Sequence, residues 1–98
     1  MEIKIQSIHF TATEKLQEYI DKKVSKLEKS NDIVRADVIL KVVKPETAMN
    51  KQADVKVLVK NENLFASKIC DTFEESVDQC VDALRIQLEK YKEKMRGV

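Results

Sequence analysis

Apolar and polar residues alternate along four short segments of the chain. Successive side chains of a strand point to opposite faces, so this alternation predicts strands with one face in a core. The clearest case is residues 52–60, where Ala53, Val55, Val57 and Val59 alternate with polar or larger side chains. The predicted strands cover residues 2–6, 33–44, 52–60 and 64–70. Residues 45–51 are predicted to form a polar loop and residues 61–63 a turn.

A first helix is predicted between the first two strands. Thr11 and Glu14 have the spacing of a capping box, and Thr13 is a second candidate for the N-cap, so the start is open by two residues. The Ser-Asn-Asp sequence at residues 30–32 is typical of a helix end. The apolar stripe of this helix consists of Leu16, Tyr19, Ile20, Val24 and Leu27.

A second, longer helix is predicted to close the chain, with Asp71 and Thr72 as capping residues. Its apolar stripe consists of Phe73, Val77, Cys80, Val81, Leu84, Leu88, Tyr91 and Met95. The element order is therefore β-α-β-β-β-α. Two amphipathic helices and four alternating strands predict an α+β fold, a two-layer sandwich with both helices on one face of a four-stranded sheet. Its length fits a single domain over residues 1–98.

Composition makes the surface unusually ionic. Hydrophobic residues make up 43% of the chain, enough for one core, and charged residues make up 36%, against roughly 25% in an average domain. The alternating N-terminus has no apolar signal segment, and no apolar run approaches the roughly 18 residues of a membrane span. Cys70 and Cys80 are expected to be reduced, small buried side chains of an intracellular protein.

Few residues have the chemistry that catalysis requires. His9 is the only histidine, and a lone histidine at a strand end is usually structural or solvated. Cys70 and Cys80 have no second histidine to complete a zinc site, and a single glycine excludes a glycine-rich phosphate loop. We therefore expect no metal, no cofactor and no enzymatic activity. A binding module is the favoured class.

The last helix is divided by charge along its length, which a net charge of +1 conceals. A helix dipole favours acids at the N-terminus and bases at the C-terminus, but that effect fades within one turn. The first half carries Asp71, Glu74, Glu75, Asp78 and Asp82 without a base. The second half carries Arg85, Lys90, Lys92, Lys94 and Arg96 against Glu89 and Glu93.

Helical geometry places part of the basic half opposite the apolar stripe, where it is expected to be exposed. This face consists of Ala83, Ile86, Gln87, Lys90 and Lys94. Its lysines suit phosphates, and Gln87 suits sugars or base edges. The first helix carries a second basic group, Lys22, Lys23, Lys26 and Lys29. If the helices pack side by side, the two groups can join; the alternative is that lysine-rich helix ends serve solubility alone.

The aromatic residues bear on the kind of nucleic acid. Tyr19, Phe73 and Tyr91 belong to the apolar stripes, which leaves Phe10 and Phe65 as poor candidates for stacking on bases. The charges therefore favour contacts with the backbone and shape of a folded RNA over single-strand stacking.

Several segments, in order, resemble the sequence pattern of one known family. Residues 13–20 resemble that family's Thr-Glu-Ala-Leu-Arg-Glu-Phe-Val, and residues 23–28 its Lys-x-x-Lys-Leu-Glu. Residues 38–42 and 66–67 resemble its second and fourth strands. Residues 87–94 resemble its Gln-Leu-x-Lys-x-Lys-x-Lys. The resemblance extends over essentially the whole chain, and the family is that of the ribosome hibernation-promoting factors, which includes the ribosome-associated inhibitor and was formerly called sigma-54 modulation proteins.

The resemblance implies a fold like that of double-stranded-RNA-binding domains. It also implies a cytoplasmic factor of stress or stationary phase, monomeric off the ribosome. Its partners are the small ribosomal subunit and ribosomal RNA, and it would block messenger and transfer RNA sterically near the decoding site. The dimerisation domain of long members is not expected here, so the chain would silence single ribosomes or pair them with an accessory factor.

Charge and resemblance together give the expected RNA-binding residues: Lys22, Lys23, Lys26, Lys29, Arg85, Gln87, Lys90, Lys92, Lys94 and Arg96. The chain departs from the family's Asp-Lys-Leu-x-Arg at residues 82–86, where Ala83 and Ile86 replace two basic residues and Arg85 is displaced by one position. At the start of the last helix, Thr72 replaces an aspartate.

Two other binding functions fit the residues. One is a module for another structured RNA. The other is a regulatory protein-interaction module that uses the acidic helix start and the open face of the sheet.

Overall fold

The computed structural model describes residues 1–30, 32–44 and 49–96, and for residues 29, 30, 95 and 96 it describes the backbone alone. The predicted stripe position Met95 therefore lies outside the described side chains, and residues 45–48 of the predicted loop lie outside the described residues. The elements are β1 (Glu2–Ile8), α1 (Glu14–Ser25), the 3-10 helix η1 (Lys26–Ser30), β2 (Ile33–Val42), β3 (Lys51–Val59), β4 (Glu62–Cys70) and α2 (Phe73–Arg96).

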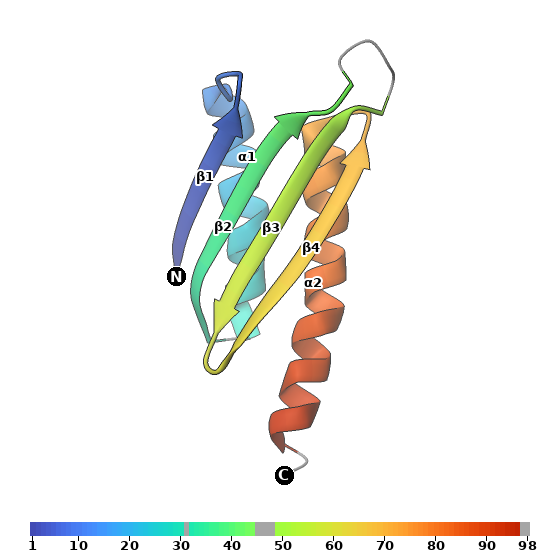
Figure 1. Cartoon of the computed structure of the whole chain (residues 1–98). Helices are drawn as coiled ribbons and strands as arrows, with labels where there is room; N and C mark the ends of the chain where they lie inside the picture. The colour runs from blue at the N-terminus through green and yellow to red at the C-terminus, as the bar shows by residue number, and fades with distance from the viewer. Residues whose placement is uncertain (31, 45–48, 97–98) are drawn as a thin grey trace.

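The strands form one sheet in the order β1-β2-β3-β4. β1 is parallel to β2, and the other two pairs are antiparallel. Both helices cover the same face, α1 behind β1 and β2 and α2 behind β3 and β4 (Figure 1). The predicted α+β architecture and the predicted order are confirmed.

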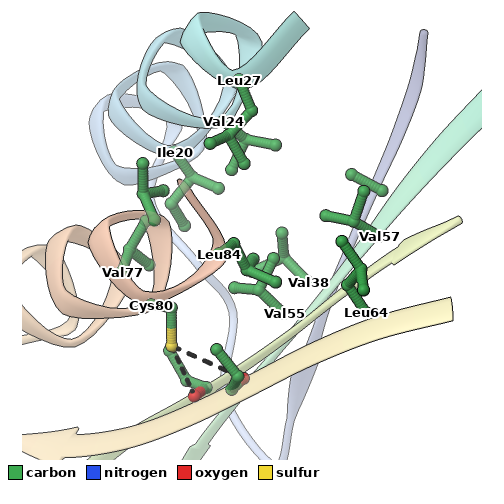
Figure 2. Close-up of a cluster of buried hydrophobic side chains, with 14 of the residues drawn as sticks. Ile20, Val24, Leu27, Val38, Val55, Val57, Leu64, Val77, Cys80 and Leu84 are labelled. Carbon is green, nitrogen blue, oxygen red and sulfur yellow. Dashed lines mark hydrogen bonds between the residues drawn. The ribbon is translucent and has the colours of Figure 1, made fainter. Parts of the chain in front are cut away.

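The core lies between this sheet face and the helices. The register aligns Val38 of β2, Val55 of β3 and Ala66 of β4 in one row across the sheet. Figure 2 shows α1 and α2 contributing the opposing side chains, among them Ile20 and Leu84, neither of which has any exposed surface. The strand alternation therefore sorts side chains as predicted, with Val55 and Val57 wholly buried.

The termini of the helices follow local side-chain chemistry. The Thr13 hydroxyl accepts a hydrogen bond from the Leu16 amide at 3.1 Å, so Thr13 is the N-cap and the capping-box alternative at Thr11 is wrong. Thr72 does the same for the Glu75 amide of α2, also at 3.1 Å. The carboxylate of Asp71 instead accepts from the Met49 amide at 2.9 Å, so it ties the loop before β3 to the start of α2.

Strand pairing shifts several predicted boundaries. β1 continues to Ile8 because Ile8 still pairs with Lys41 of β2. The β3–β4 turn begins at Lys60, earlier than predicted, because Asn61 adopts a left-handed backbone with φ 71° and strand pairing resumes at Glu62. Asparagine tolerates this conformation better than most residues.

Two small side chains connect α2 to the sheet through hydrogen bonds. The Ser76 hydroxyl, which has no exposed surface, lies 2.6 Å from the Lys51 carbonyl and 3.1 Å from that of Thr72. The Cys80 thiol donates to the carbonyl of Ala53 at 3.3 Å, and Figure 2 shows it directed at the strands. Cys70 and Cys80 are both free and buried, as expected.

The surroundings of Cys80 suppress its reactivity. Desolvation raises the pKa of the Cys80 thiol to about 11, and the negative charge of Asp54 adds to the shift. The thiolate, which is the reactive form, is therefore scarce near neutral pH.

Replacement of Leu84 with alanine is expected to lower the free energy of unfolding by about 2–5 kcal/mol, because it leaves a cavity in the core. Urea unfolding of the purified variant measures the loss. The matched control is Ile86→Ala in the same helix, because Ile86 is 56% exposed and its truncation should cost about 0.5 kcal/mol or less. Equal losses in both variants would contradict the placement of α2.

Candidate nucleic-acid interface

The two helices run in the same direction along the sheet, each starting at the end where β1 and β4 finish (Figure 1). Their N-termini therefore lie at one end of the molecule, together with the acidic half of α2. Their basic C-terminal halves point toward the other end. α2, with 24 residues or about 36 Å, extends beyond the end of α1 (Figure 1).

A side-chain cluster joins the helices near their acidic ends. The Tyr19 hydroxyl of α1 lies 2.8 Å from each carboxylate oxygen of Asp78 of α2. The Lys23 ammonium lies 3.3 Å from the same carboxylate and 5.7 Å from the centre of the Tyr19 ring. Asp78, which belongs to the predicted acidic group, therefore forms an ion pair with Lys23, which belongs to the predicted RNA-binding set.

The phenol of Tyr19 titrates abnormally as a result. Desolvation raises its pKa to about 12, and the hydrogen bond to Asp78 and the negative charges of Asp78 and Glu74 act in the same direction. The phenol thus stays protonated, and able to donate to Asp78, across the physiological range.

The basic residues of α2 divide between two flanks. Seven residues make nearly two helical turns, so Arg85 and Lys92 share the flank of Asp78, which faces α1. Gln87, Lys90 and Lys94 lie on the other flank. There they line a hollow of about 220 Å³ with Tyr91 of the same helix and with Glu62 and Leu64 of β4. The sequence-predicted face is thus separated from α1 by the width of α2.

The prediction that Gln87 is exposed opposite the core is wrong. Its side-chain amide donates to the Phe65 carbonyl on the edge strand β4 at 2.8 Å, and the side chain is partly buried. One turn further, the Tyr91 hydroxyl donates to the Lys60 carbonyl at 2.6 Å. The edge of the sheet therefore lies beside this flank, which a helical projection of one segment cannot reveal.

The other predicted residues differ in availability. Lys22 is exposed on α1, Lys26 is exposed at the start of η1, and Lys90 and Lys94 are exposed on α2. Arg85 makes one loose contact of 3.9 Å with Asp82. Within the described part of the chain, the recorded ion pairs include neither Lys90 nor Lys94. Lys29 lies in η1 and Arg96 is the last residue of α2, and their side chains lie outside the described residues.

Two contacts were not predicted from the sequence: one joins the two helices, and the other joins the β1–α1 connection to α2. Tyr19 was assigned to the apolar stripe, but its hydroxyl binds Asp78; a tyrosine on a stripe beside an acidic helix is the signal for such a bond. Phe10, considered only as a stacking candidate, stacks on Phe73 with ring centres 5.0 Å apart. This contact fixes the β1–α1 connection against the first turn of α2.

Nothing in the described residues forms a centre for metal chemistry, since no group of three potential ligands occurs among them. No described helix combines the length and the apolar character needed to cross a membrane. The flank of α2 beside β4 presents the cations Lys90 and Lys94, the amide of Gln87 and the ring of Tyr91 to a binding partner.

The fold and the charge-divided helix layer define a small α+β binding module. A family model described as Sigma 54 modulation protein / S30EA ribosomal protein matches residues 3–96. The chain belongs to this family, whose members are ribosome-associated, non-enzymatic factors. No significant match is found among curated protein sequences.

Two solved structures share the fold. A ribosomal subunit interface protein from Coxiella burnetii superimposes with a TM-score of 0.84 and 24% identity, over 94% of this chain and 98% of that chain. The N-terminal domain of Protein Y from Thermus thermophilus gives a TM-score of 0.80 and 20% identity, over 93% of this chain and 99% of that chain. At these identities the likeness establishes the fold.

The cluster around Tyr19 predicts an unusual titration. In a Tyr91→Phe variant, Tyr19 is the only tyrosine, and its tyrosinate absorbance should appear with a midpoint near pH 12 instead of the ordinary 10. Adding Asp78→Asn should lower the midpoint toward 10. Circular dichroism at each pH verifies that the fold persists.

The sign of the stability effect follows from the raised pKa. The folded state favours the protonated phenol, so the contribution is complete below pH 10 and is lost as the pH rises through about 12. A midpoint near 10 with Asp78 intact would contradict the hydrogen bond.

Proposed function

We propose that this protein is a ribosome hibernation factor of the cytoplasm. It binds the small ribosomal subunit near the decoding site during stress or stationary phase and sterically blocks messenger and transfer RNA. Membership of a ribosome-associated family supports the ribosome as partner. The observation that carries the RNA-binding part is the parallel packing of the helices, which directs both lysine-rich halves toward one end (Figure 1).

The overhanging part of α2 is the proposed centre of the contact. It bears Lys92 on the flank toward α1 and Lys90 and Lys94 on the flank toward β4, so a groove of folded RNA can meet cations on both of its walls. Phosphates bind such cations with release of counterions, and no bond needs to form or break. Lys22, Lys26 and Arg85 extend the cationic surface toward α1, and Lys29 and Arg96 are proposed to belong to it.

Lys23 and Gln87 have a different proposed role. Lys23 is held by Asp78, and Gln87 is held by the Phe65 carbonyl. Their removal is therefore expected to affect RNA affinity mainly through the position of the helices. Of the two residues that replace basic residues of the family pattern, Ile86 leaves the solvent side of α2 less charged, whereas Ala83, expected to be exposed, is half-buried against the core. The contact consequently depends more heavily on the overhang.

Ribosome binding can be tested by sedimentation with charge variants. The protein should sediment with small subunits at low salt, and the double variant Lys90→Gln, Lys94→Gln should bind more weakly. Its plot of log affinity against log salt should also become flatter by about 1–2, in proportion to the lost phosphate contacts. An unchanged slope would show that these lysines do not contact RNA.

The control removes the same charge from the other end of the molecule. Lys15→Gln, Lys41→Gln alters residues near the start of α1 and the end of β2, far from the overhang. It should sediment like the unaltered protein. A similar loss in both double variants would indicate nonspecific attraction instead of a defined contact.

Occlusion predicts competition. Prebound protein should lower the binding of messenger RNA and initiator transfer RNA to purified small subunits in a filter assay, and the Lys90→Gln, Lys94→Gln variant should do so less. Simultaneous binding of all three components would contradict the steric mechanism while leaving ribosome association intact.

A further inference from the structure

The face of the sheet that the helices do not cover has a distinct pattern of charge (Figure 1). One row across it consists of Lys4, Asp37, Lys56 and Phe65, each paired with the next in the strand register. Lys4 and Lys56 are exposed, and Asp37 lies between them. Neighbouring strands are about 4.8 Å apart, so the row spans about 14 Å.

The acids in the middle of this face are already occupied. Asp37 forms an ion pair with Arg35 at 3.3 Å. Asp54, in the adjacent row, accepts hydrogen bonds from the Ser67 hydroxyl and, at 2.9 Å, from the Gln52 amide. The charge of Asp37 is thus offset by Arg35, and Asp54 lies in the next row, so Lys4 and Lys56 are the cations best placed to meet an external anion.

The cations surround a shallow depression. It has a volume of about 340 Å³ and is open to solvent. Its lining residues are Lys4, Gln6, Arg35, Asp37, Ile39 and Lys56, with part of Val38. Arg35 and Asp37 form an ion pair with each other, so the charges of Lys4 and Lys56 remain in excess. The depression therefore attracts a negatively charged group.

An exposed aromatic ring lies at one end of the row. The sequence alone made Phe65 a poor candidate for stacking on bases, but its side chain is 55% exposed on this face, whereas Phe10 stacks on Phe73. The strand partner of Phe65 is Lys56. An aromatic ring beside lysines on an open four-stranded sheet is a platform on which a base can stack while its phosphates meet the cations.

We propose that this open face, which we call the sheet platform (Lys4, Lys56 and Phe65), binds single-stranded RNA. A base stacks on Phe65 and the adjoining phosphates contact Lys56 and Lys4. The site is separate from the helix overhang because it lies on the opposite face of the sheet. A chain with both surfaces can hold a folded RNA on one side and a single strand on the other.

The pattern favours RNA over a protein partner. The exposed apolar side chains of β4 on this face are Phe65 and Ile69, with Ser67 between them, and Ile39 and Leu58 of the neighbouring strands are half-buried. The exposed pair is too small to form an apolar docking patch. An acidic peptide would satisfy the lysines but has no need of an exposed ring.

Site-specific fluorescence provides the test. The chain has no tryptophan, so Phe65→Trp introduces a single reporter that can also stack. A uridine oligomer of about eight nucleotides should quench its emission and bind with submillimolar affinity at low salt. In anisotropy measurements with the labelled oligomer, Phe65→Leu should bind at least about fivefold more weakly, while Phe65→Trp binds as well as the unaltered protein.

Charge variants test the phosphate contacts. In the double variant Lys4→Gln, Lys56→Gln, the slope of log affinity against log salt concentration should become flatter by about 1.4. This is about 0.7 for each lost phosphate contact with a single strand. Ile69→Ala, which alters the neighbouring exposed side chain of the same strand, should leave binding unchanged. Thermal unfolding of each variant verifies the fold.

Other outcomes overturn the proposal. No binding of the oligomer at low salt, equal binding by Phe65→Leu, or equally effective competition by a polyglutamate peptide would each refute it. So would loss of oligomer binding in Lys90→Gln, Lys94→Gln with the sheet platform intact. Because the assay contains no ribosome, its result is independent of whether the protein silences ribosomes.

Discussion

The side-by-side, parallel packing of two helices on one sheet face is the constraint on which the charge distribution depends. Only one face of the sheet is covered by helices, and both helices follow strands that end at the same edge (Figure 1). Their dipoles therefore point the same way and repel side by side, unless charges of opposite sign offset each end. The acids at the start of α2 and the lysines at the end of α1 provide that compensation.

This arrangement accounts for an acidic segment longer than one helix dipole requires. Asp78 lies beyond the first turn of α2, where its own helix gains little from it. It is instead the acceptor for Tyr19 and Lys23 of α1. The acid is therefore an interhelical contact as well as part of a charge gradient. The same contact pairs Lys23, a cation that the family pattern assigns to RNA binding, with Asp78.

The sequence predicted the elements well because periodicity is a local property. Val55 and Val57 alternate with polar residues whatever surrounds them, and their burial follows. Boundaries depended on pairing: β1 continues to Ile8 because β2 lies beside it. Gln87 was misplaced because a helical projection identifies the side away from the core but not the strand edge that approaches it. The pairing of Lys23 could not be predicted because its partner, Asp78, belongs to the other helix.

Some residues of the candidate surface thus hold the two helices together, and others remain exposed to contact RNA. A cation near the helix contact stabilises the pair, and the same proximity to Asp78 weakens its attraction for phosphate. Cations on an overhang escape this conflict because only one helix reaches them. The extension of α2 beyond α1 therefore places the contact between the helices and the cations available to RNA at different positions along α2. Asp78 and Tyr19 hold the helices together near one end, and Lys90 and Lys94 remain exposed toward the other. With a net charge of +1, affinity for RNA must come from this placement, since the total charge provides almost none.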